Sequence, residues 1–312
     1  MKLIQKIHIN SFLLNIIIIF SICLSISCQN SDNSNELVSV PIVFNEELED
    51  GHLDASAYIT VVIDSIPLNL FLDTGNPGAS IDLTTKTLEK IEVKYTGQTK
   101  KTQDYQANEF EGREYILPRV KIGDLEFTNI HATEHKMKSS SDGTISFKFL
   151  QNYNVLIDFP NRNMRLYKLG YLPKYLRHQS WTRVNAFDLG GFTLSLKLDG
   201  VEEDFIFALD NAAIALDDEQ KPYGLIKLKS PFGDYLVKNE LIITKEDDPA
   251  IVGIFSTSDL KLHGRKIPDL DFMVVDYKYP ERDGLLGYNF FIKHPMFIDF
   301  KNYKLYIKIN EN

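Results

Sequence analysis

The chain has 312 residues and a formal charge of −9, with 44% hydrophobic and 25% charged residues, the fractions of an ordinary globular protein. This length allows one large domain or two modest ones, and an acidic chain without a basic stripe argues against a nucleic-acid partner. Both cysteines, Cys23 and Cys28, lie near the N-terminus. The body therefore has no disulfide framework and no thiolate metal cage.

The first 28 residues have the layout of a secretory signal peptide. Lys2 and Lys6 precede an apolar run, Phe12–Leu24, and small residues lead to Cys28. The end of this segment resembles a bacterial lipoprotein signal, in which the cysteine becomes the lipidated first residue, and we expect Cys28 to carry a lipid. An uncleaved anchor helix is the alternative. Both interpretations predict an exported protein held at a membrane, facing the periplasm or the exterior.

Residues 29–55 are expected to contain a polar tether and the first strand. Beyond them, short stretches rich in β-branched and aromatic residues alternate with turn residues, which predicts a β-rich body. Helix candidates are few and short. They are Thr84–Glu92, Phe147–Asn152 and Tyr288–Ile292.

The sequence repeats itself. Residues 142–161 read DGTISFKFLQNYNVLIDFPN and residues 283–302 read DGLLGYNFFIKHPMFIDFKN, sharing Asp-Gly at the start and Asp-Phe-x-Asn at the end. Upstream, Val120–Phe127 resembles Leu260–Ile267 as strand, turn and strand. Matches in the same order indicate an internal duplication.

Each copy also contains an apolar strand that ends in an aspartate, Leu70–Asp73 in the first and Phe207–Asp210 in the second. The distance from this aspartate to the later Asp-Gly glycine is 70 residues in one copy and 74 in the other. We therefore expect an all-β fold of two lobes, 56–170 and 171–312, with a cleft between them.

Asp73, Thr74 and Gly75 are the strongest candidates for chemistry. A carboxylate at the end of a buried strand is held by its backbone, and glycine permits the tight turn that exposes it. Thr74 can form hydrogen bonds without adding charge. The alternative is a structural Asx turn after the strand.

The apolar-Asp-Thr-Gly motif, followed by Gly284-Leu285-Leu286-Gly287 in a duplicated β-rich chain, resembles the pepsin/retropepsin-like aspartic proteases. Asn154–Phe159 resembles a segment of the retropepsin-like proteins of bacterial envelopes. This resemblance implies an aspartic-type endopeptidase with a peptide or protein substrate and without cofactor or metal. Its catalytic pair would be Asp73 and Asp210. Its supporting residues would be Thr74, Gly75 and Asn211.

Two positions depart from the family pattern. The second copy reads Asp210-Asn211-Ala212 in place of Asp-Thr/Ser-Gly, and Ser146 replaces the closing glycine of the first copy. Both an active enzyme with altered geometry and a non-catalytic lipoprotein that binds peptide or glycan fit this pattern. A third hypothesis pairs Asp73 with Asp73 of a second molecule. Because the second lobe already occupies that docking face, we expect a monomer.

The interval Tyr95–Tyr115 is polar and corresponds to the hairpin that covers the catalytic pair in this family. A mobile lid and an ordinary exposed loop are both open interpretations. His131 and His135 are four residues apart, which would suit a metal on a helix. Because the surrounding pattern is that of a strand, surface or turn histidines are favoured.

Three aromatic residues, Tyr171, Tyr175 and Trp181, follow the first copy. They could form a platform on which a sugar stacks. Packing between the two lobes is the favoured interpretation.

Overall fold

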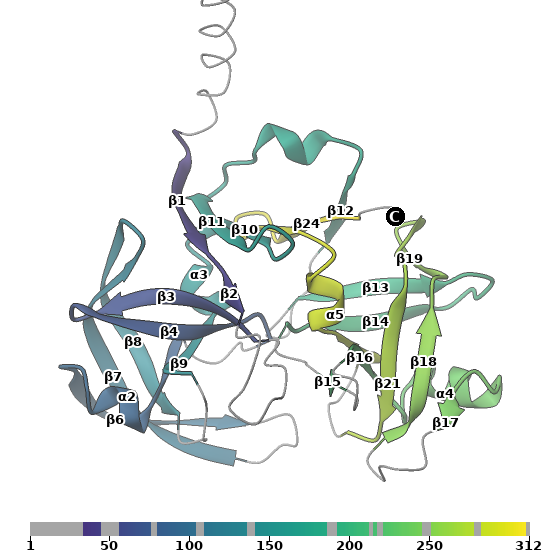
Figure 1. The fold of residues 1–312 in the computed structure, drawn as a ribbon, viewed down its shortest axis with the longest axis horizontal. Helices are drawn as coiled ribbons and strands as arrows, with labels where there is room; N and C mark the ends of the chain where they lie inside the picture. Colours follow the sequence, from purple (N-terminus) through teal and green to yellow (C-terminus); the bar gives the residue numbers. More distant parts are fainter. Residues whose placement is uncertain are drawn as a thin grey trace, which may run out of the picture.

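The computed structural model describes residues 34–44, 56–75, 80–103, 109–135, 141–185, 192–211, 215–216, 221–244, 251–277 and 282–309. Their strands form three sheets. Two sheets build separate lobes and the third lies across both, as Figure 1 shows. The prediction of an all-β, duplicated, two-lobed chain with a few short helices is confirmed. Within the described part, no helix has the length and hydropathy needed to cross a bilayer.

The first lobe contains an eight-stranded sheet. In spatial order its strands are β2 (Val43–Phe44), β3 (Ala57–Ile63), β4 (Ile66–Asp73), β9 (Gly143–Ser146), β5 (Ile81–Thr84), β8 (Leu125–His135), β7 (Glu109–Ile122) and β6 (Lys94–Gln103). β7 also pairs with β3, which closes one end of the sheet.

The second lobe contains a ten-stranded sheet. In spatial order its strands are β17 (Ile243–Thr244), β18 (Ile251–Thr257), β21 (Leu270–Val275), β16 (Pro222–Lys227), β22 (Gly284–Leu286), β14 (Asp204–Leu209), β13 (Thr193–Leu198), β19 (Leu260–Leu262) and β20 (Arg265–Lys266). β15 (Ala215–Leu216) pairs with β16 at the side.

The third sheet takes strands from both copies and lies above the lobes in Figure 1. Its strands are β1 (Glu36–Pro41), β11 (Asn163–Lys168), β10 (Tyr153–Asp158), β23 (Met296–Asp299), β24 (Lys304–Lys308) and β12 (Trp181–Asn185). The helices are α2 (Thr85–Leu88), α3 (Phe147–Leu150), α4 (Pro231–Lys238), α5 (Tyr288–Phe291) and the 3₁₀ helix η1 (Lys174–Arg177).

The two lobes share one strand arrangement. In the first lobe β4 runs parallel to β9, which pairs antiparallel with β5. In the second lobe β14 runs parallel to β22, which pairs antiparallel with β16. β10–β11 and β23–β24 are matching antiparallel hairpins, and β10 pairs with β23 where the two copies meet. The duplication in the sequence is therefore a duplication of structure.

The repeated Asp-Gly pair holds this arrangement together. Asp142 accepts a hydrogen bond from the Asn69 amide of β4, and Asp283 accepts one from the Ile206 amide of β14. A Cβ added at Gly143 would lie 2.1 Å from a backbone oxygen of β5, and one at Gly284 would lie 2.3 Å from a backbone oxygen of β16. Only glycine allows the central strand to lie this close to its neighbour.

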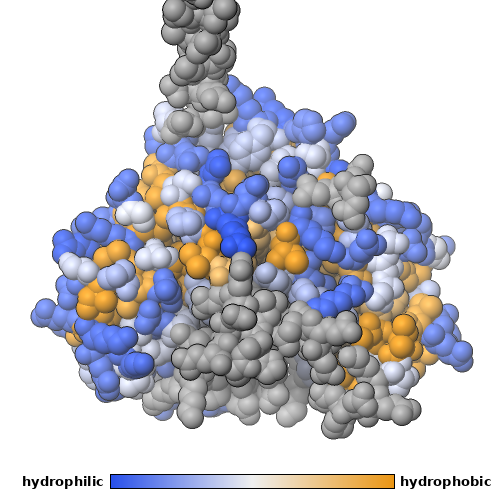
Figure 2. Space-filling view, in the orientation of Figure 1, coloured by the Kyte–Doolittle hydropathy of each residue, from blue (hydrophilic) through white to orange (hydrophobic). Residues whose placement is uncertain are grey.

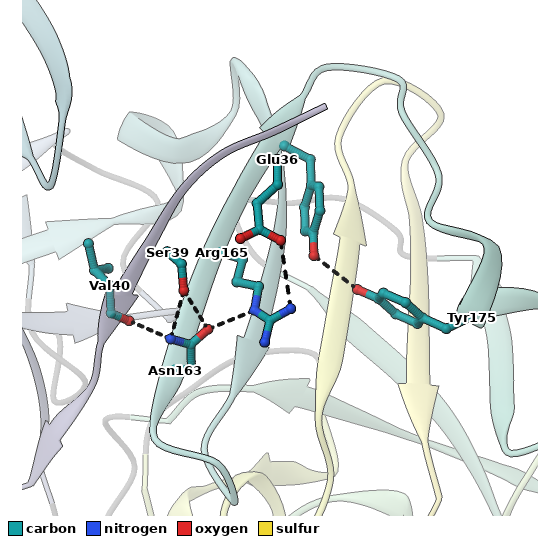
Figure 3. A network of polar contacts seen from close by, with 7 residues as sticks. Glu36, Ser39, Val40, Asn163, Arg165 and Tyr175 are labelled. Atoms are coloured by element: carbon teal, nitrogen blue, oxygen red, sulfur yellow. Dashed lines mark hydrogen bonds and ion pairs between the residues drawn. The ribbon is translucent and has the colours of Figure 1, made fainter. Parts of the chain in front are cut away.

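The N-terminal strand β1 is fixed to β11 by side chains as well as by the ladder (Figure 3). The Asn163 amide donates to Ser39 Oγ at 2.9 Å and to the Val40 carbonyl at 3.3 Å. Arg165 Nε donates to Asn163 Oδ1 at 2.9 Å, and Arg165 Nη1 lies 3.6 Å from Glu36 Oε2. The segment that follows the tether is thus part of the six-stranded sheet.

The six-stranded sheet has two unlike faces. Its inner face, which includes Val155 and Ile298, belongs to the large core shared with both lobes. Its outer face carries a separate aromatic cluster that contains Tyr167 and Phe297. Tyr171, Tyr175 and Trp181 pack on that outer cluster, which combines residues of both copies on the sheet that the two lobes share. η1 turns back over the sheet and covers it there.

His294, between α5 and β23, is fully buried. Its Nδ1 lies 3.2 Å from the Lys308 carbonyl, and its Nε2 has no hydrogen-bond partner among the described residues. Burial, opposed by the contact with the Lys308 carbonyl, lowers the pKa of His294 from 6.5 to about 4. The imidazole is therefore neutral in the folded chain at neutral pH.

This burial predicts a fold that weakens in mild acid. Between pH 6.5 and about 4 His294 binds a proton in the unfolded chain but not in the folded chain. The free energy of unfolding therefore falls by about 3 kcal/mol as the pH is lowered across this window. Urea unfolding at stepped pH measures the loss. His294→Gln removes the titrating group and should flatten this part of the curve. An equally steep fall in the variant would assign it to other groups.

Candidate active site

Asp73 and Asp210 occupy equivalent places in the two lobes. Asp73 is the last residue of β4 and stands opposite Ser146 in the parallel ladder with β9. Asp210 directly follows β14, and its amide donates to the Leu286 carbonyl at 3.1 Å. Both aspartates are half-buried at the end of a strand whose preceding residues are buried. β4 and β14 belong to facing lobes, as Figure 1 shows.

The two aspartate loops exchange hydrogen bonds across the lobes. The Thr74 amide donates to Asn211 Oδ1 at 2.7 Å, and the Asn211 amide donates to Thr74 Oγ1 at 2.9 Å. Asn211 Nδ2 donates to the Leu72 carbonyl at 2.5 Å. Thr74 and Asn211 are each 1% exposed, so the exchange is shielded from water. It fixes the two loops relative to each other.

Both aspartates converge on Gly75. Its amide donates to Asp73 Oδ1 at 2.9 Å. A Cβ added at Gly75 would lie 2.3 Å from Cγ of Asp210 and 2.5 Å from each of its carboxylate oxygens. The Asp210 carboxylate therefore fills the space that a side chain at position 75 would need.

Ser146, which corresponds to Gly287 of the second copy, is the N-cap of α3. Its hydroxyl accepts a hydrogen bond from the Lys148 amide at 3.2 Å and contacts the Ser80 carbonyl at 3.4 Å. The equivalent N-cap of α5, Gly287, has no side chain to cap with. A serine at this position supplies a helix cap and is compatible with the loop.

The interval Tyr95–Tyr115 lies in an antiparallel hairpin of β6 and β7, whose connection, residues 104–108, lies outside the described residues. Lys100 of β6 lies near Asp82 of β5, which is on the sheet face that carries Asp73. Burial and the nearby charge of Lys148 lower the pKa of Lys100 on β6, while Asp82 and Glu114 oppose this shift. Asp82 and Thr144 form part of that same face.

An ion pair fastens this hairpin to the lobe. Arg113 of β7 donates two hydrogen bonds to the buried Glu134 of β8, from Nε at 2.9 Å and from Nη2 at 3.1 Å. Thr85 Oγ1 donates a third at 2.9 Å. The Arg113 hydrogen bond outweighs the effect of burial, and the pKa of Glu134 falls to about 2. The pair holds the hairpin beside α2.

The remaining sequence candidates do not join this site. His131 and His135 both lie on β8, and His131 Nδ1 is 3.4 Å from Glu114 Oε1. The described residues contain no cluster of three or more His, Cys, Asp or Glu side chains suited to a metal ion. Cys28 and Ala212 lie outside the described residues.

Comparison with known proteins supports the fold. No family model and no curated protein matches this sequence. Among solved structures, the aspartic proteinase from Irpex lacteus is similar at 12% sequence identity, with a TM-score of 0.57 over 88% of this chain and 97% of that one. At this identity the match establishes architecture alone. The chain has a two-lobed fold similar to that of the aspartic proteinases.

Proposed function

We propose that the chain is an aspartic-type endopeptidase of the cell envelope, in which Asp73 and Asp210 activate water against a peptide bond. The observation that carries the proposal is the convergence of both carboxylates on Gly75. The exchange between Thr74 and Asn211 supports it, because it gives the two loops one fixed relation.

In the proposed dyad the two carboxyl groups share one proton, because two carboxylates in hydrogen-bond contact cannot both ionise cheaply. The ionised carboxylate accepts a proton from a bound water, whose oxygen attacks the peptide carbonyl. The protonated carboxyl stabilises the developing oxyanion, and a proton then passes to the leaving amine. The pair titrates as a unit, so these roles belong to the dyad.

Asn211 is compatible with this chemistry. Its amide supplies both an acceptor, used by the Thr74 amide, and a donor, used on the Leu72 carbonyl. These interactions occur within one chain, which favours a monomer over pairing through Asp73 of a second molecule. The signal-like residues 1–28 and Cys28 support a lipid-anchored, exported location.

Asp73→Asn and Asp210→Asn are each expected to reduce peptide cleavage by about a thousandfold or more, because each removes one ionisable member of the dyad. The assay uses a peptide library between about pH 4 and 7. Asp124→Asn, in an exposed turn between β7 and β8, is the matched control and should leave cleavage unchanged.

Undiminished cleavage by Asp73→Asn would refute the catalytic assignment. If the wild type binds peptides but cleaves none, the non-catalytic alternative holds, in which the same loops serve a binding site for peptide or glycan.

A further inference from the structure

The six-stranded sheet and its loops carry a charge opposite to that of the chain. Residues 34–44, 151–185 and 293–309 contain ten Lys and Arg and only three Asp and Glu, whereas the whole chain has 34 and 43. This part of the molecule therefore has a charge of +7 within a chain of −9. Figure 2 shows mainly hydrophilic residues over the top of the molecule, where this sheet lies in Figure 1.

Cations of three strands, β11, β12 and β24, lie on the outer face. Arg165 stands opposite Leu156, Arg183 opposite Tyr306, and Lys308 opposite Trp181, and these partners belong to the outer aromatic cluster. Directly opposed residues of an antiparallel pair share a face. η1 and the adjoining loops add further exposed cations, Lys174, Arg177 and Lys301. Lys168, the last residue of β11, is also exposed, and it stands opposite Tyr153 of the inner face.

Of the three acidic groups of this region, one is paired with an arginine, one is buried, and Asp158 keeps its charge near the surface. Glu36 lies 3.6 Å from Arg165. Asp299 is 1% exposed and accepts a hydrogen bond from the Asn302 side chain. Asp158 accepts two from the Asn161 side chain. The outer face therefore presents unbalanced positive charge to its surroundings.

Exposed apolar side chains accompany the cations. Leu169 is 46% exposed, Leu172 40% and Tyr303 73%. The Lys301 side chain lies against Gly170, where a Cβ would come within 2.6 Å of it, so the β23–β24 turn adjoins the loop that holds Leu169. Lysine and arginine beside leucine and tyrosine are the residues that bind the interface of a charged bilayer.

The start of the described chain, at Asn35, lies beside the end of β11. The Lys168 amide donates to the Asn35 carbonyl at 3.0 Å, so the chain enters the fold beside the end of β11 and the loop that holds Leu169. Even when fully extended, the residues from Cys28 to Asn35 span at most about 25 Å. An anchor at Cys28 would therefore keep this loop within that distance of the membrane.

We propose that the outer face of the six-stranded sheet docks on anionic lipid headgroups of the membrane that anchors the chain. The inference rests on the proposed anchor at Cys28. Each lysine or arginine near an anionic leaflet contributes about fivefold to such an equilibrium, and the short tether raises the effective concentration. In the docked state the aspartate loops, which lie beyond the inner face of this sheet, point away from the bilayer.

Trp181, the only tryptophan of the chain, reports docking directly. The full-length chain is reconstituted into phosphatidylcholine vesicles or vesicles with about one-third phosphatidylglycerol, each with a headgroup spin label that quenches tryptophan. We expect strong quenching of Trp181 only in the anionic vesicles. Raising the salt to about 0.5 M should reverse it, because surface charges are then screened. Equal quenching in both lipids would overturn the proposal.

Charge reversal of Lys168, Lys174, Arg177 and Lys301 to glutamate should lower the docking equilibrium by at least about a hundredfold. The matched control reverses four exposed lysines elsewhere, and it should dock like the wild type. These are Lys86, Lys94, Lys197 and Lys238. Equal loss in both variants would reduce the effect to net charge and overturn the proposal.

Flotation of the same vesicles distinguishes a chain that lacks the lipid anchor from one that is anchored but does not dock. A chain that does not float with either lipid lacks the anchor, and the docking proposal then falls with it. A chain that floats without lipid-dependent quenching is anchored but not docked. Peptide cleavage in solution is a separate measurement, so the endopeptidase proposal stands or fails independently of both results.

Discussion

Gly75→Ala is expected to abolish measurable peptide cleavage while the chain still folds. The new methyl group would lie 2.3 Å from Cγ of Asp210 and 2.5 Å from both carboxylate oxygens. Since such contacts do not occur, the Asp210 carboxyl must move by roughly 1 Å, and misplacement on that scale costs on the order of 10²-fold in rate. Loss of the shared proton would add to this, toward about 10⁴-fold.

A double-mutant cycle on stability tests the cause. Overpacking at Gly75 should lower the free energy of unfolding by about 1–3 kcal/mol. Asp210→Ala removes the carboxyl that the new methyl group would strike, so Gly75→Ala should cost much less in that background. Urea unfolding of the four proteins measures the coupling. Additive effects would show that Gly75 accommodates something other than Asp210.

The duplication made most of the fold predictable from sequence. Asp142-Gly143 and Asp283-Gly284 recur because each lobe needs a carboxylate for a strand amide and a strand without a Cβ at the same place. Such requirements leave identical residues at equal spacing. The pairing of β1 with β11 leaves no comparable trace, because its partners lie more than 120 residues apart and neither strand specifies the other.

Some local features were missed for the same kind of reason. Helix α4 has a serine N-cap at Ser230 and Pro231 at its start, the usual signs of a helix beginning. The sequence did not predict α4, because the helix is only eight residues long and contains Gly233. The aromatic residues around Trp181 were correctly expected to pack, but composition does not tell which face of a sheet they cover.

Asn211 shows where sequence reasoning about the site reached its limit. An asparagine in place of threonine suggested an altered loop, because the two side chains differ in length. Whether the amide could replace the hydroxyl depends on the distance between the loops, which no sequence pattern supplies. In the structure the Asn211 amide accepts from the Thr74 amide and donates to the Leu72 carbonyl.

Asn211→Ala is therefore expected to lower the free energy of unfolding by about 4 kcal/mol. It would strand the Thr74 amide and the Leu72 carbonyl in a region where both residues are buried, and each orphaned buried group costs about 1–3 kcal/mol. Cleavage should fall as well, because the two loops lose two of their three mutual hydrogen bonds. Urea unfolding and the peptide assay measure the two losses.

Asn211→Thr is the matched control, because a hydroxyl also accepts and donates. It should retain both contacts and cost less than about 1 kcal/mol. Asn211→Asp can accept from the Thr74 amide but cannot donate to the Leu72 carbonyl, and it places a further negative charge between Asp73 and Asp210. The expected order of stability is therefore asparagine first and threonine second, with aspartate and alanine both below threonine. Threonine as damaging as alanine would contradict the role of Asn211 as a donor and acceptor, and would make its contribution one of shape.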